Sequence, residues 1–211
     1  RVSGVPADMT DEKILRMIVD NDYSSALEHI SFSFDVSEIS IALSRELLEH
    51  RIASHTARST RYQEETDFGY YIPKEFESKS EAKKRYEDAM KNLAETYRDL
   101  REMGVSRESS RHILPMAAHT NYIWTINARS LINFLGLRLC VRAAPEMREL
   151  AKKVYEIAVE KYPEVFDNID CRGWNMAACP ENKVREGARP ACPYRKKVPT
   201  KEEIRRERAG K

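Results

Sequence analysis

Apolar and polar residues alternate in the stretch HISFSFDV, which spans residues 29–36. Ile30, Phe32, Phe34 and Val36 fall on one side, and the residues between them are polar or charged. This period of two is typical of a strand with one buried face. The stretch HTNYIWTIN at residues 119–127 predicts a second strand, with Trp124 in the core.

Apolar residues spaced three and four apart predict helices before, between and after these strands. Ser37, followed by Glu38, suits the start of the second helix, and Asn127 suits the N-cap of a later one. Gly104 is placed to end the longest helix, and Pro145 to begin the last one. The expected helices run from Asp8 or Thr10 to about Val19, and over residues 37–50, 80–103, 107–113, 128–143 and 145–162.

The order of these elements favours an α+β fold with an antiparallel or mixed sheet and several helices, because strands and helices do not alternate as βαβ units. We expect one domain over residues 1–166 and a cysteine-containing basic tail over residues 167–211. Residues 194–211 carry eight basic and three acidic side chains, a net charge of +5, so we expect the tail to be mobile. No glycine-rich phosphate loop is present.

Composition narrows the function classes. The chain has 211 residues, with 36 Lys and Arg against 34 Asp and Glu, and this near balance argues against nucleic acid as a partner. No apolar run approaches the ~18 residues of a membrane span, and no signal peptide is visible, so we expect a cytoplasmic protein without a membrane partner.

Three of the four cysteines fall late, at Cys171, Cys179 and Cys192. The closely spaced cysteine pair of most zinc sites is missing, so we predict no metal ligands and favour free thiols. A disulfide and a metal or cluster site remain the alternatives.

One segment concentrates groups that bind anions. HRIASHTARSTRY, residues 50–62, contains three arginines, two histidines and four Ser or Thr hydroxyls. It lies at the predicted end of a helix, where the helix dipole is negative, so an anion would have to be bound by side chains rather than by backbone amides. Guanidinium forks and hydroxyls suit phosphate oxygens.

The same segment carries a resemblance to a known family. Arg51, followed after seven residues by Ser59 and then by Arg61 and Tyr62, resembles the signature of flavin-dependent thymidylate synthases. Further matches lie in order along about 180 residues: RVS at 1–3, LEHISFSF at 27–34, YYIP at 70–73, RHILP at 111–115, WTINARSLINFLGLR at 124–138 and CPE at 179–181. Since the chain begins at the family's early RVS, the resemblance suggests that the family's first strand is missing.

The resemblance implies the flavin-dependent thymidylate synthase fold and a homotetramer with active sites shared between subunits. It also implies reductive methylation of dUMP to dTMP, a step of nucleotide biosynthesis. FAD would be the cofactor, with NADPH and methylenetetrahydrofolate as co-substrates. Hydride would pass from the reduced flavin to the pyrimidine, so the protein's part would be positioning and electrostatics.

Residue roles follow from the same resemblance. Arg138 would be catalytic, contacting the pyrimidine as a fixed cation, although an internal salt bridge is the alternative for this arginine. Asn127 has the alternative of serving only as a cap, and His50 that of a helix-end histidine. The implied dUMP-binding residues are Ser59, Arg61, Arg111, Arg138 and Glu46, and the implied FAD-binding residues are Ser3, Ser25, His50, Arg51, Asn127 and Asn133.

Some positions depart from the family pattern. Glu46, Glu49 and Ala57 stand where the family usually has Gln, Arg and Glu, and Arg58 and Arg142 are additional cations. We hypothesise that Glu49 pairs with Arg58 or Arg142. Because these departures alter charge near the implied ligands, two alternatives stay open: a diverged flavin enzyme with another pyrimidine substrate, or a non-catalytic homologue acting as a structural partner.

Overall fold

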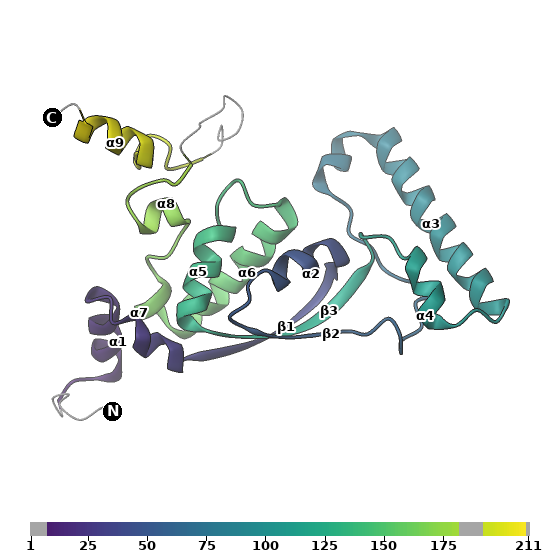
Figure 1. Ribbon diagram of the computed structural model, residues 1–211, viewed down its shortest axis with the longest axis horizontal. Coiled ribbons are helices and arrows are strands. Elements are labelled where there is room, and N and C mark those ends of the chain that lie inside the picture. The colour runs from purple at the N-terminus through teal and green to yellow at the C-terminus, as the bar shows by residue number, and fades with distance from the viewer. Residues whose placement is uncertain (1–7, 182–191, 210–211) are drawn as a thin grey trace. The chain divides into compact units, whose positions relative to one another are not determined.

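The computed structural model describes residues 8–181 and 192–209, and these residues form two compact units. The central unit contains residues 32–126, and the terminal unit combines the described residues up to 31 with those from 127 onward. Figure 1 labels the elements of both units. The expected site residues are therefore divided: Ser59, Arg61 and Arg111 lie in the central unit, and Asn127, Asn133 and Arg138 in the terminal unit.

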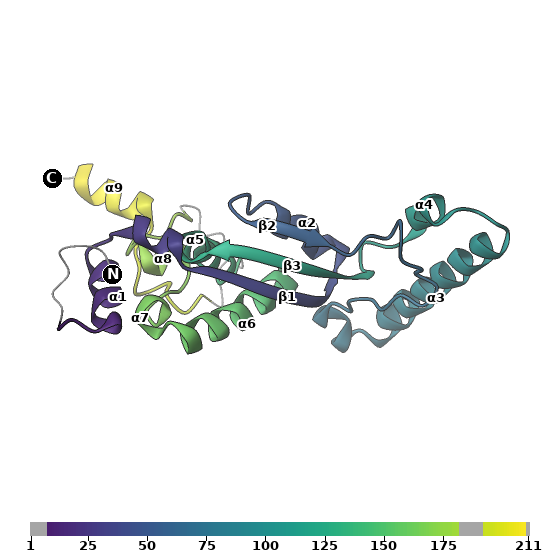
Figure 2. The ribbon, with the colours of Figure 1, turned by 90° about the horizontal axis from the view of Figure 1, so that it is seen from below.

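The central unit is built on a three-stranded sheet in the order β1-β3-β2, with β3 in the middle (Figure 2). The strands β1 (Ser31–Ser40) and β3 (His119–Asn127) confirm the two predicted strands. The short strand β2 (Ser54–Ala57) was not predicted, and it pairs antiparallel with β3. The apolar side chains of β1 are buried as their alternation predicts, and the Phe34 and Trp124 rings lie 5.7 Å apart between centroids.

Helix α2 (Ile41–Leu48) begins later than predicted. Residues 37–40 continue strand β1, and Ser40 is the N-cap, its Oγ accepting a hydrogen bond from Leu43 N at 2.9 Å. Glu38 adopts a left-handed φ of 57°, and its N–H donates to Asn121 Oδ1 on β3 at 3.1 Å. The prediction of a helix starting at Ser37 is therefore wrong, because sheet contacts hold this serine in an extended strand.

The other described helices of the central unit lie in the connection between β2 and β3. They are η2 (Lys74–Ser78), α3 (Ser80–Glu102), α4 (Arg107–Ser110) and η3 (Arg111–Ile113). Gly104 follows α3 with φ of 83°, as expected for a glycine that ends a helix. Tyr97 of α3 is fully buried, and its hydroxyl accepts a hydrogen bond from Glu65 N at 3.4 Å. This contact fixes the segment after β2 against α3.

The terminal unit contains α1 (Asp11–Asp20), η1 (Ser24–His29), α5 (Ala128–Arg138), α6 (Pro145–Lys161), α7 (Pro163–Phe166), α8 (Arg172–Asn175) and α9 (Lys201–Ala209). Helix α5 packs against η1, α6 and α8, and α1 packs against α7, where Arg16 and Asp167 form a bidentate ion pair (Figures 1 and 2). Helix α5 ends at Arg138, five residues earlier than predicted. Helix α9, which was not predicted, lies in the tail that we expected to be mobile.

Burial explains why α5 lies at the centre of this unit. Leu131, Phe134 and Leu135 are fully buried, and Met147, Ala151 and Ala158 of α6 are buried as well. Each large apolar side chain contributes about 1.5–3 kcal/mol on burial. Among the described helices, none combines the length and apolar character needed to cross a membrane.

Candidate active site

The anion-binding segment starts at the end of α2 and passes through β2. Pairing of Ser54 with Thr125 and of Ala57 with Tyr122 fixes β2 on β3, and Arg58 N continues the ladder to Asn121 O at 2.9 Å. The chain then turns, with Ser59 O accepting hydrogen bonds from Tyr62 N and Gln63 N. The sheet therefore determines where this turn, which carries Ser59 and Arg61, begins.

Arg61 is held by a carboxylate of its own chain. Its Nε lies 3.1 Å from Glu108 Oε1, and its Nη2 lies 3.4 Å from Glu108 Oε2. Its guanidinium also lies over the Tyr62 ring, 5.7 Å from the centroid. Both side chains of the pair are about half exposed, at 48% and 58%, so water screens the pair and an incoming phosphate can compete for the arginine.

Arg111 follows directly on the helix that carries Glu108. It is the first residue of η3, is partly buried, and its guanidinium makes no hydrogen bond or ion pair within the residues that the structure describes. Through Glu108, Arg61 is linked to the short helix α4, and Arg111 directly follows that helix. The charge of Arg111 is not neutralised by any described residue. The structure therefore connects two of the sequence-predicted phosphate ligands through one short helical segment.

Glu64 supports this arrangement, and sequence reasoning missed it. Arg101 Nε and Arg107 Nε each lie 2.7 Å from one of its carboxylate oxygens, and Arg107 also donates to the Tyr62 carbonyl at 3.0 Å. The hydrogen bond from Arg101, followed by that from Arg107, lowers the pKa of Glu64 below 4.5. The turn is thereby attached to α3 and α4. No sequence pattern links these positions, because the contacts span about forty residues.

Arg58 and Arg142 have carboxylate partners other than Glu49 in the described chain, and the hypothesis that Glu49 pairs with one of them across subunits stays a prediction. Arg58 Nη2 lies 3.1 Å from Glu65 Oε1, and Arg142 pairs with Glu181. Glu49 is exposed at the end of α2 and has no ion pair among the described residues. Each additional cation is therefore bound by a carboxylate that the sequence analysis did not consider.

The remaining expected ligands of the central unit lie around the end of α2. Glu46 is partly buried in the last turn of that helix. His50 is partly buried just beyond it, and its carbonyl accepts a hydrogen bond from His55 Nε2 at 3.2 Å. Arg51 is exposed, and its guanidinium has no ion pair within the described ranges 8–181 and 192–209.

In the terminal unit, the two asparagines have different surroundings. Asn127 caps α5, with its Oδ1 accepting from Ser130 N at 2.9 Å, so the predicted cap is confirmed. Asn133 is exposed, and its Oδ1 accepts from Arg172 Nη2 at 3.4 Å. Ser25 is exposed in η1, whereas Ser3 lies outside the described residues.

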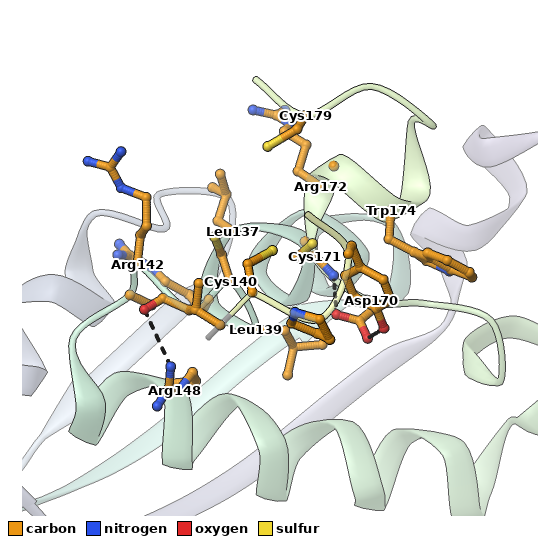
Figure 3. A pocket seen from close by; sticks show the side chains of 18 of the residues that line it. Leu137, Leu139, Cys140, Arg142, Arg148, Asp170, Cys171, Arg172, Trp174 and Cys179 are labelled. Atoms are coloured by element: carbon orange, nitrogen blue, oxygen red, sulfur yellow. Dashed lines mark hydrogen bonds between the residues drawn. The ribbon is translucent and has the colours of Figure 1, made fainter. Parts of the chain in front are cut away.

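Arg138 lines a pocket of about 890 Å³. Figure 3 shows this pocket and labels other residues of its wall, among them Leu137 and Arg142. The wall is formed by the end of α5, the loop to α6, α6 itself and residues after Ile169. Arg142, Arg148 and Arg172 also line it, and Arg148 Nη1 donates to Val141 O at 3.3 Å. The sequence motif identified Arg138 but not this pocket, because the C-terminal part of the wall shows no periodic pattern.

A tyrosine and an aspartate reinforce that C-terminal part. The Tyr194 hydroxyl donates to Asp170 Oδ2 at 2.5 Å, and this hydrogen bond is the main cause that raises the pKa of Tyr194 to about 12. Tyr194 also packs on Trp174, with ring centroids 4.7 Å apart. Among the described residues, no group of three or more His, Cys, Asp or Glu side chains is placed to hold a metal ion.

Comparison with known proteins gives a consistent result. Residues 3–164 match the family model described as thymidylate synthase complementing protein. Three relatives, each named flavin-dependent thymidylate synthase, come from Nitratidesulfovibrio vulgaris, Saccharolobus solfataricus and Geobacter sulfurreducens. They are 32%, 40% and 38% identical to this chain over 79%, 75% and 82% of its length. The matches cover 71%, 62% and 75% of those relatives, so part of each relative lies beyond this chain.

Proposed function

The chain belongs to the thymidylate synthase complementing protein family, and we propose that it acts as a flavin-dependent thymidylate synthase, reductively methylating dUMP to dTMP. The family match over residues 3–164 and the shared name of the relatives support this activity. Methylenetetrahydrofolate is the proposed one-carbon donor, and NADPH the proposed reductant of FAD.

Two arginines next to α4 carry the substrate proposal: Arg61, which pairs with Glu108 of that helix, and Arg111, which directly follows it. A nucleotide phosphate has up to two negative charges, and Arg61 and Arg111 together offer two guanidiniums where Glu108 offers one competing carboxylate. Ser59 adds a hydroxyl from the turn that carries Arg61. We therefore assign the dUMP phosphate to Ser59, Arg61 and Arg111. Glu46 is proposed to bind dUMP only because the family resemblance implies it.

Arg138 is the proposed catalytic residue. It lies at the last position of α5, where the negative end of the helix dipole stabilises a cation. A guanidinium keeps its charge at any physiological pH, so it can stabilise negative charge that develops on the pyrimidine during methylation. Its role is electrostatic, and it does not exchange protons with the base.

The described residues that we expect to bind FAD carry hydrogen-bonding groups that suit a flavin dinucleotide. Arg51 is exposed with an unpaired guanidinium in the described chain, as a diphosphate ligand requires, and His50 lies beside it. The exposed Ser25 and Asn133 offer neutral hydrogen-bonding groups, while Asn127 uses its Oδ1 to cap α5 and has its amide nitrogen left to donate. The flavin, when bound, supplies the hydride of the reaction. We assign its binding to these residues and to Ser3.

We further propose a homotetramer with active sites shared between subunits, as the family resemblance implies. In that arrangement, site residues of different chains can face one nucleotide. A cytoplasmic location fits the four cysteines, none of which forms a disulfide.

Titrations of the purified full chain with FAD and with dUMP test the proposal. Replacing a guanidinium that binds phosphate removes a charge-assisted contact of about 1.5–3 kcal/mol, which corresponds to about 10- to 150-fold in affinity. Arg111→Gln is expected to weaken dUMP binding by that factor and to leave FAD binding unchanged. The matched control is Arg85→Gln, an exposed arginine on α3 that should change neither affinity.

Two results would contradict the proposal in different ways. If the wild-type protein shows no change in the flavin spectrum on titration with FAD, it is not a flavin enzyme. If Arg111→Gln binds dUMP as tightly as the wild type, the phosphate is bound elsewhere.

A further inference from the structure

All four cysteines of the chain line the pocket that contains Arg138, although they are spread from position 140 to position 192. Cys140 follows the end of α5, and Cys171 is the N-cap residue of α8. The function proposed above uses none of these thiols. Their convergence on one pocket is therefore a feature that still needs an explanation.

Close packing of α5 and α8 brings two of the cysteines together. At Gly136 the helix lacks a side chain, and a Cβ there would lie 3.7 Å from the backbone nitrogen of Arg172 and 3.4 Å from Asn175 Nδ2. The start of α8 can thus lie directly against the last turns of α5. Cys140 is four residues beyond Gly136, and Cys171 immediately precedes Arg172.

Figure 3 draws Cys140 and Cys171 among the side chains that line the pocket, and both are partly buried. Burial is the main cause that raises the pKa of the Cys171 thiol, and the charges of Asp170 and of Cys140 raise it further. Both thiols lie in the part of the pocket wall where the end of α5 packs against the start of α8. Cys179 is buried separately, because its Sγ packs against Gly173, where an added Cβ would lie 3.5 Å away.

We propose that Cys140 and Cys171 are a redox modification site, which forms an intramolecular disulfide when the protein meets a small-molecule disulfide. The bond would join the end of α5 to the start of α8. It would also place a reversible covalent link in the wall that carries Arg138.

The chemistry is a two-step thiol–disulfide exchange. The Cys140 thiolate attacks one sulfur of the small disulfide, forming a mixed disulfide and releasing the first small thiolate. The Cys171 thiolate then attacks the Cys140 sulfur and releases the second. The two protons of the protein thiols go to the two released thiolates, and the small disulfide is reduced as the cysteine pair is oxidised.

The cysteine positions make the test direct, because trypsin separates the four residues. Cleavage after Lys and Arg places Cys140 in peptide 139–142, Cys171 in 162–172, Cys179 in 173–183 and Cys192 in 186–195. The folded full chain is incubated with oxidised glutathione and alkylated. It is then digested without reductant and analysed by mass spectrometry.

We expect a cross-linked species joining peptides 139–142 and 162–172, with a mass lower by two hydrogen atoms than their sum, which disappears on reduction. Cys171→Ser should leave a glutathione adduct on Cys140, and Cys192→Ser should leave the cross-link in place. The disulfide closes a loop of about thirty residues, so the oxidised wild type should melt about 7–14 °C higher than the reduced protein. Cys171→Ser should show no such shift.

Other outcomes would overturn the proposal. They are a stable glutathione adduct on Cys140 in the wild type, a cross-link to the peptide of Cys179 or Cys192, or a disulfide between two chains. None of these readouts depends on flavin or nucleotide binding, so a failure here is distinguishable from a failure of the proposed function.

Discussion

The ion pair between Arg61 and Glu108 makes a quantitative prediction about substrate affinity. If Arg61 binds the phosphate of dUMP, it must first leave the Glu108 carboxylate, whose oxygens lie 3.1 and 3.4 Å from its nitrogens. Glu108→Gln keeps the shape of the side chain and removes its charge. We therefore expect the variant to bind dUMP more tightly than the wild type.

The magnitude follows from the exposure of the pair. With side chains 48% and 58% exposed, such an interaction contributes about 0.2–1 kcal/mol. Releasing it should lower the Kd for dUMP by a factor between about 1.4 and 5. The gain should shrink at high salt, because exposed charges are screened over about 10 Å at 0.1 M ionic strength and over less at higher concentrations.

Isothermal titration calorimetry of the FAD-loaded protein with dUMP, at low and at high salt, measures this effect. Glu95→Gln is the matched control, since Glu95 is an exposed glutamate of α3 without an ion pair in the described chain. An unchanged or higher Kd in Glu108→Gln, beside an unchanged control, would refute the idea that Glu108 competes with the phosphate for Arg61.

Three further predictions concern the fold. Burial raises the pKa of Glu65 above 4.5, more than the Arg58 charge lowers it, so the ionised carboxylate destabilises the folded state at neutral pH. Glu65→Gln should therefore raise Tm at pH 7, and thermal melts should show the difference vanish below about pH 4.5, where the carboxyl is protonated in both states. For Glu64 the sign is opposite: its lowered pKa stabilises the fold above pH 4.5, so Glu64→Gln should lower Tm at pH 7, and this deficit should disappear as acid protonates the wild-type carboxylate. Asn127→Ala should remove the cap of α5 and lower the free energy of unfolding by about 1 kcal/mol in urea titrations, whereas Asn127→Asp should retain most of it.

The elements that the sequence predicted well are those whose pattern is local. Strand β1 buries Phe32 and Phe34 as their alternation requires, and Asn127 caps α5 through a contact three residues away. Strand β2 escaped prediction because its four residues have no apolar alternation, and only pairing with β3 makes them a strand. Helix α2 has its N-cap at Ser40 rather than starting at Ser37 as predicted. The reason is that Asn121, distant in the sequence, accepts a hydrogen bond from the Glu38 amide and keeps this segment in the strand.

In the candidate site, too, local motifs could be predicted from the sequence and long-range contacts could not. The motif located Arg61, Arg111 and Arg138, but their surroundings depend on contacts between distant segments. Glu108 lies 47 residues from Arg61 in the sequence, and the pocket around Arg138 includes residues up to Val198. Charge pairing over such separations leaves no periodic signal, so the sequence alone could not show which arginines are already neutralised.

The formation of dTMP by the purified chain is the most direct measurement of its activity. The protein is incubated anaerobically with dUMP, FAD, NADPH and methylenetetrahydrofolate, and the nucleotides are separated by chromatography. We predict that dTMP accumulates, that omission of FAD or NADPH stops its formation, and that Arg138→Gln slows it while Arg85→Gln does not. Absence of dTMP from wild-type protein that binds both FAD and dUMP would contradict the assignment of this chain as a flavin-dependent thymidylate synthase.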